Sequence, residues 1–143
     1  MSSRLASDEA YILSICDKLL GCPSLRQQRF DFLVGRPSLK TGRAQRLPVD
    51  AFYPSKDLVV EYHERQHTGP VPFFDRRVTA CGLTRDEQRR VYDQLRRELI
   101  PQHGLNLIVI DYSQFDVDGQ GRIRRGRDEE ARVRAALSSF LDH

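Results

Sequence analysis

The sequence predicts one α/β domain, a mixed sheet of four strands flanked by helices, in the order α-β-β-β-α-β-α. Three observations predict this class. The 143 residues match one domain and can bury a core without disulfides. Apolar residues recur at helical spacing in three segments. Between them lie short segments rich in β-branched and aromatic residues, bounded by turn signals. No internal repeat or linker divides the chain, so we expect residues 1–143 to form a single domain.

The first half of the chain begins with a predicted amphipathic helix over residues 8–20. Ser7 is a suitable N-cap, and Gly21 is a suitable stop. A strand is predicted over residues 29–34, followed by a polar connection over residues 36–46. Its four basic residues are Arg36, Lys40, Arg43 and Arg46. This connection suits contact with a phosphate backbone, and it equally suits a solvated loop.

The centre of the chain predicts an antiparallel hairpin. Its strands cover residues 47–53 and 58–63, and the second has the strongest β-propensity in the chain. A long ordered loop is expected over residues 68–83, where glycines and prolines surround a short apolar run.

The second half of the chain predicts a helix, a strand and a final helix. A capping box of Thr84 and Glu87 opens the helix over residues 84–103, whose arginines we expect on a solvated face. The near-continuous apolar run of residues 105–111 predicts a strand buried on both faces. Residues 128–141 predict the last amphipathic helix.

Two acidic residues stand on the predicted hairpin among apolar neighbours. Asp50 lies on its first strand and Glu61 on its second. Buried carboxylates side by side repel each other and call for a cation, such as a divalent metal ion with oxygen ligands. Alternation along a strand places His63 on the same face as Glu61, where an imidazole can serve in acid–base chemistry. The alternative for each residue is an ordinary ion pair or hydrogen bond.

These residues carry a resemblance to a known family. Pro48-Val49-Asp50, followed eleven residues on by Glu61-Tyr62-His63, resembles the PD-(D/E)XK nuclease signature, with His63 in place of its Lys. The tract closing in Gln66-His67 is similar to the branch related to very-short-patch-repair endonucleases. The similarity to this branch extends to the segment from Tyr92 to Arg97 and to the run from Gly104 to Ile110. The resemblance covers residues 9–112.

The resemblance implies a restriction-endonuclease-like core, dependence on Mg²⁺ or Mn²⁺, and DNA as substrate. It implies metal ligation by Asp50 and Glu61, with Glu9 of the first helix as a third acidic group. The catalytic set that it implies is Asp50, Glu61, His63, Gln66 and His67.

The composition indicates the partners and the cellular compartment that we expect for the chain. Its net charge is +3, and 20 of its 23 basic residues are Arg, which favours phosphate contacts or reflects a GC-rich genome. The three cysteines fit no zinc pattern and suit a reducing cytoplasm. No signal peptide or membrane span is predicted, so we expect a cytoplasmic protein. The sequence is compatible with a monomer and with a homodimer.

Three functions follow, in decreasing order of preference. The first is an endonuclease that cleaves DNA with Mg²⁺. The second is an inactive nuclease fold that binds nucleic acid or serves as a subunit of a larger DNA-processing system, which the missing Lys favours. The third is a metal hydrolase of another fold, with His63 and His67 as a ligand pair at helical spacing.

Overall fold

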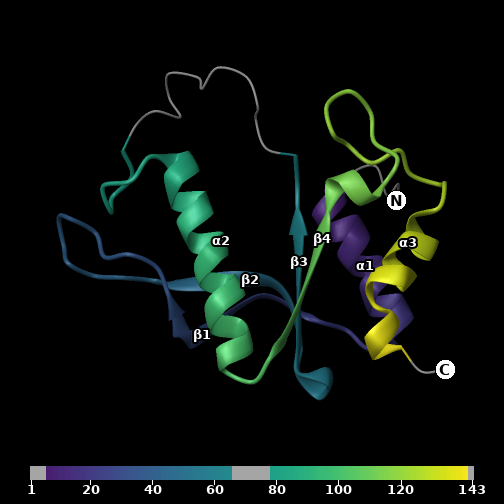
Figure 1. The fold of residues 1–143 in the computed structure, drawn as a ribbon, viewed down its shortest axis with the longest axis horizontal. Coiled ribbons are helices and arrows are strands. Elements are labelled where there is room, and N and C mark those ends of the chain that lie inside the picture. Colours follow the sequence, from purple (N-terminus) through teal and green to yellow (C-terminus); the bar gives the residue numbers. More distant parts are fainter. Residues whose placement is uncertain (1–5, 66–77, 142–143) are drawn as a thin grey trace.

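The computed structural model describes residues 6–65 and 78–141, which form three α-helices and one sheet (Figure 1). The helices are α1 (Asp8–Leu20), α2 (Arg85–Gln102) and α3 (Glu129–Ala136), and the strands are β1 (Leu25–Val34), β2 (Arg46–Tyr53), β3 (Leu58–His63) and β4 (Asn106–Asp111). Their order along the chain agrees with the predicted order.

The sheet is mixed, with strand order β1-β2-β3-β4. The first three strands are antiparallel neighbours, and the predicted hairpin of β2 and β3 is confirmed by the pairs Ala51↔Val60 and Tyr53↔Leu58. Strand β4 runs parallel to β3, so the chain must cross over between them, and α2 lies in that crossover.

Helices cover both faces of the sheet (Figure 1). On one face α1 and α3 pack over Val60, Tyr62 and Ile110. On the other face α2 packs over Val59, with Ile100 as its fully buried residue. Strand β3 contributes to both clusters, and each of its residues from Leu58 to Tyr62 is buried.

Burial differs from the prediction for the strand at residues 105–111. It was expected to be buried on both faces, but β4 is an edge strand and Ile110 is its one buried residue. Strand β1 begins at Leu25, earlier than predicted, because Leu25 pairs with Phe52 of β2.

The ends of two helices also differ from the prediction. The capping box of Thr84 and Glu87 is confirmed at the start of α2, which ends at Gln102, one residue before the predicted end. The last helix is shorter than expected, because α3 ends at Ala136 and a 3₁₀ turn over Ser138–Phe140 follows. The described helices are all too short or too polar to cross a bilayer.

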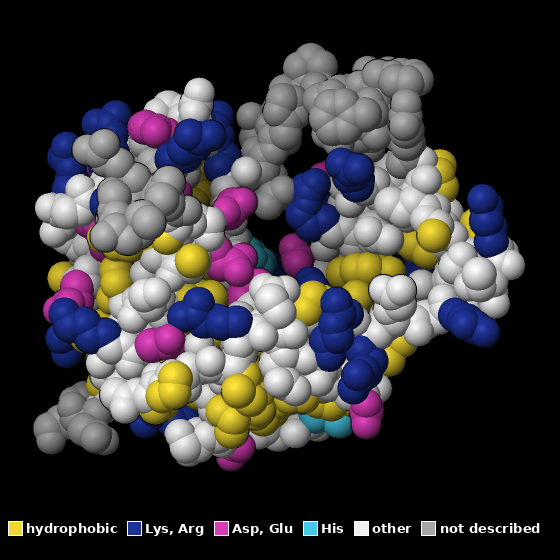
Figure 2. All heavy atoms as spheres, turned by 180° about the vertical axis from the view of Figure 1, so that it is seen from behind, with side chains coloured by type: hydrophobic (Ala, Val, Ile, Leu, Met, Phe, Trp, Pro, Cys, Tyr) yellow, Lys and Arg dark blue, Asp and Glu magenta, His cyan; other side chains and the backbone are white. Residues whose placement is uncertain are grey.

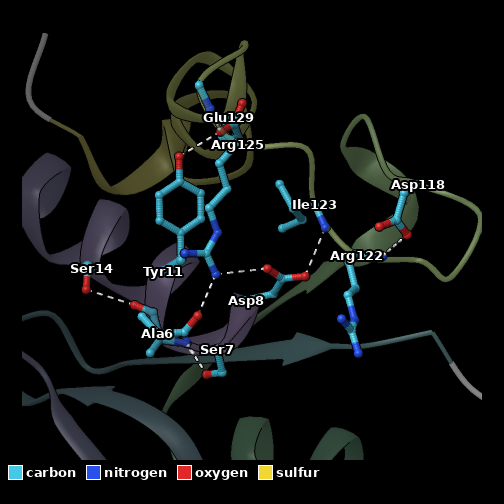
Figure 3. A network of polar contacts seen from close by, with 12 residues as sticks. Ala6, Ser7, Asp8, Tyr11, Ser14, Asp118, Arg122, Ile123, Arg125 and Glu129 are labelled. Carbon is cyan, nitrogen blue, oxygen red and sulfur yellow. Dashed lines mark hydrogen bonds and ion pairs between the residues drawn. The ribbon is translucent and has the colours of Figure 1, made fainter. Parts of the chain in front are cut away.

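Polar contacts fix the first turn of α1 to the segment that precedes α3 (Figure 3). Asp8 accepts a hydrogen bond from Arg125 at 3.1 Å, and the Tyr11 hydroxyl donates to Glu129 at 2.7 Å. The Arg125 guanidinium also lies 4.4 Å from the centre of the Tyr11 ring. Glu129 is only 3% exposed, so this contact holds two elements together inside the protein. These contacts hold the first turn of α1 in place, and this turn includes Glu9, which follows Asp8 in the chain.

Candidate functional site

The backbone ladder between β2 and β3 stops beside two carboxylates. Its last pair is Ala51↔Val60, and the next residues in register are Asp50 and Glu61. The Asp50 N–H donates to Glu61 Oε2 at 2.6 Å, and the Tyr62 N–H donates to Asp50 Oδ2 at 2.8 Å. Side-chain oxygens thus take the place of backbone carbonyls, which holds both carboxylates at the point where pairing ends.

Strand β2 is irregular at the same position. Alternation would place Val49 and Ala51 on one face, yet Val49 packs in the cluster under α2 and Ala51 in the cluster under α1. Across the sheet, Gln27 of β1 falls opposite Asp50 in the register and has a left-handed φ of 54°. The irregular backbone is therefore local to the acidic residues.

Asp50 and Glu61 line a pocket of about 210 Å³ that we call the acidic pocket. Its other walls come from both helix layers, with Glu9 from α1 and Asp93 and Arg96 from α2. The pocket is also lined by Tyr62, His63, Glu64 and Arg89. Figure 2 shows acidic side chains gathered around a hollow in this face, with basic side chains on both sides.

Burial is the main cause that raises the pKa values of three carboxyl groups of the acidic pocket. Burial, followed by the charge of Asp50, raises the pKa of Glu61 from 4.5 to about 8. Burial also raises the pKa of Asp50. Burial and the charges of Asp50 and Glu64 raise the pKa of Glu9 from 4.5 to about 6. The pocket thus disfavours the charged form of these carboxyl groups, so it favours a bound proton or a bound cation.

Arg96 forms an ion pair with Glu61, and its position corrects the prediction that the α2 arginines lie on a solvated face. Its side chain is 15% exposed, and its Nε lies 3.7 Å from Glu61 Oε1. The same side chain contacts Asp93 Oδ1 at 3.1 Å and donates to the Pro48 carbonyl at 3.1 Å. Its signal was present in the sequence, because Arg96 lies one helical turn before Leu99 on the stripe that packs on the sheet.

The predictions for His63 and His67 have different outcomes. His63 ends β3 and lines the acidic pocket, while the intervening Tyr62 packs in the cluster under α1, as alternation predicts. No described residue hydrogen-bonds to the His63 imidazole. Gln66 and His67 lie outside the described residues, as does most of the predicted loop over residues 68–83. Because His63 belongs to a strand, the helical pairing with His67 is wrong.

Within residues 6–65 and 78–141, no three His, Cys, Asp or Glu side chains are grouped so that they could hold a metal ion. Asp50 and Glu61 are brought together as a pair, and Glu9 shares their pocket. The donors are carboxylate oxygens, which suit a hard cation bound by one or two protein carboxylates, with water or phosphate completing its shell.

Comparison with models of protein families, with curated proteins and with solved structures finds no match to this chain.

Proposed function

We propose that the protein is a metal-dependent endonuclease that hydrolyses phosphodiester bonds in DNA. One observation carries the proposal: Asp50 and Glu61 face each other where the β2–β3 ladder ends, in a pocket rich in negative charge. A buried carboxylate pair without a cation is costly, and a divalent metal ion that also binds a phosphate would relieve this cost.

The topology is compatible with a restriction-endonuclease-like core. Helix α1 precedes an antiparallel meander of β1, β2 and β3, and α2 leads to a fourth strand parallel to β3. This arrangement supports the assignment that the sequence resemblance implies, with the acidic residues on the second and third strands.

Asp50 and Glu61 would hold Mg²⁺ or Mn²⁺, with Glu9 as the third acidic group of the site. A bound ion would polarise the phosphate and activate a water molecule. This assignment fits the oxygen donors of the pocket. The second feature that favours a cation there is the described lining, which holds five carboxyl groups against two arginines.

The chain's own side chains supply the remaining chemistry. His63 occupies the position of the signature's Lys, and its imidazole nitrogen can take the proton of the attacking water or return one to the leaving oxygen. Arg96 holds Glu61 in place, and its positive charge can stabilise the charge that develops on the phosphate. Gln66 and His67 complete the proposed catalytic set.

The test is cleavage of supercoiled plasmid DNA by purified protein in Mg²⁺ or Mn²⁺. We expect nicking by the native protein and a loss of about 100-fold or more in Asp50→Asn and Glu61→Gln, because each removes a charged oxygen ligand. Glu98→Gln, an exposed change on α2, is the matched control and should cleave normally. If Asp50→Asn cleaves as fast as the native protein, the proposed site is wrong.

A second candidate is a nuclease fold that binds nucleic acid without cleaving it. Glu61 already accepts the Asp50 N–H and pairs with Arg96, so part of its charge is engaged without a metal. The signature's Lys is also absent. This candidate predicts DNA binding that weakens steeply with salt and no cleavage in any divalent ion.

A further inference from the structure

Arg96 borders a second and larger hollow of about 710 Å³, which we call the arginine pocket. Five arginines line it, from β1, the β1–β2 connection, the start of β2, and α2: Arg29, Arg36, Arg43, Arg46 and Arg96. No Asp or Glu of the described ranges joins this lining. A concave surface with several positive charges and no acidic lining residue suits a ligand with several negative charges.

Among the described residues, three of these arginines, Arg29, Arg36 and Arg43, form no ion pair with a carboxylate. Arg46 pairs with Asp31 at 3.0 Å, and Arg96 pairs with Asp93. Arg36 and Arg43 are exposed, and neither forms an ion pair with an acidic residue in the described part of the chain. Their guanidinium groups can therefore form the paired hydrogen bonds that phosphate oxygens accept.

The β1–β2 connection that carries Arg36 and Arg43 is held by backbone contacts. The Gly35 N–H donates to the Gln45 carbonyl at 2.9 Å, and the Ser38 N–H donates to the Arg43 carbonyl at 2.8 Å. The Arg36 N–H donates to the Tyr92 hydroxyl of α2 at 3.0 Å. The connection is thus ordered before any ligand binds, which lowers the entropy lost on binding.

We infer that the arginine pocket binds successive phosphate groups of a nucleic-acid strand whose neighbouring phosphodiester enters the acidic pocket. The inference rests on the proposed function, because it places the strand relative to that site. Arg96 links the two pockets, since it lines both and lies 3.7 Å from Glu61. Tyr92 is the one aromatic residue in the described lining, so stacking on bases is limited and recognition is through the backbone, independent of base sequence.

The test measures binding of an oligonucleotide of about 20 nucleotides by fluorescence anisotropy in EDTA, so that neither metal nor cleavage contributes. The variant is Arg36→Gln/Arg43→Gln. The matched control is Arg124→Gln/Arg134→Gln, which removes the same charge from exposed positions outside the arginine pocket. We expect about tenfold weaker binding or more at low salt, and a slope of log affinity against log salt that falls by about 2. The control should retain native affinity and slope.

Equal affinities and slopes for the two double variants would overturn the inference. A mononucleotide that binds as tightly as the oligonucleotide would also overturn it, because the pocket would then hold a free phosphate compound rather than a strand. Cleavage is measured in a separate experiment from binding, so that the proposed function and the inference can fail independently. A native protein that never cleaves but binds through Arg36 and Arg43 refutes the proposed function alone. Cleavage that needs Asp50, with unchanged binding in Arg36→Gln/Arg43→Gln, refutes the inference alone.

Cys81 gives a second readout, because it lines the arginine pocket and Cys22 does not. The hydrogen bond with Thr79 lowers the pKa of Cys81 to about 7, so this thiol reacts readily near neutral pH. We expect saturating oligonucleotide to slow alkylation of Cys81 several-fold and to leave the rate at Cys22 unchanged. Unchanged alkylation of Cys81 under saturation would contradict binding in this pocket.

Discussion

The pH dependence of stability follows from the burial of Glu61, and the variant Glu61→Gln tests it. In the native protein its pKa rises from 4.5 to about 8. Between these values the folded state binds more protons than the unfolded state, so stability falls as pH rises. A group raised in this way gives its full stabilisation below its unfolded pKa and loses it as pH rises through its folded pKa. The amide of Gln can still accept the Asp50 N–H but does not titrate.

The expected change in the free energy of unfolding follows from the same pKa values. Linkage for an isolated carboxyl group gives a loss of roughly 2–3 kcal/mol between about pH 5 and about pH 7. Asp50 titrates together with Glu61, so we expect roughly 2 kcal/mol from this substitution. Urea denaturation in EDTA at both pH values measures the free energy of unfolding. Glu61→Gln should gain about this much relative to the native protein as pH rises, with exposed Glu98→Gln as the control.

Parallel changes in stability for the native protein and Glu61→Gln across this range would refute the reasoning. The Glu61 carboxylate would then be as well compensated in the folded state as in water. The source of that compensation would be Arg96, which lies 3.7 Å away.

Two further predictions concern the metal and the core. Adding millimolar Mg²⁺ at about pH 8 should raise the melting temperature of the native protein measurably and leave that of Asp50→Asn unchanged, since a ligand of the folded state stabilises it by mass action; equal rises would place the bound ion elsewhere. Tyr53→Phe should lower the free energy of unfolding by about 1–2 kcal/mol in urea denaturation, because the Tyr53 hydroxyl donates to Asp17 at 2.5 Å; an unchanged value would mean that this contact contributes nothing.

The fold could be predicted in order and type because strong local patterns mark each element. Ser7 caps α1 and accepts from Ala10, and the box at Thr84 opens α2. Burial of whole strands could not be predicted in the same way. Residues 105–111 are as apolar as a central strand, but their place at the sheet edge depends on pairing with β3 alone, which is a property of the whole fold.

Strand alternation and hairpin pairing were enough to predict which residues would share the pocket. Those rules bring Asp50, Glu61 and His63 to one pocket. They could not predict how the two carboxylates would be held, because each accepts a backbone N–H from the opposite strand only where the regular ladder ends. The spacing from Leu99 could have shown that Arg96 faces the sheet, but its contact with Glu61 depends on how α2 packs across the sheet.

The net charge of +3 conceals two opposed regions. The described lining of the acidic pocket holds five carboxyl groups against two arginines. The arginine pocket carries surplus positive charge, with Arg36 and Arg43 unpaired among the described residues. Arg96 lines both. The charges of the two pockets do not neutralise each other, because Arg96 is the one side chain that their described linings share. A polyanion accompanied by a divalent cation would relieve both at once, the phosphates against the arginines and the cation between the carboxylates. The two proposals, a metal ion between the carboxylates and a nucleic-acid strand along the arginines, are therefore consistent with each other.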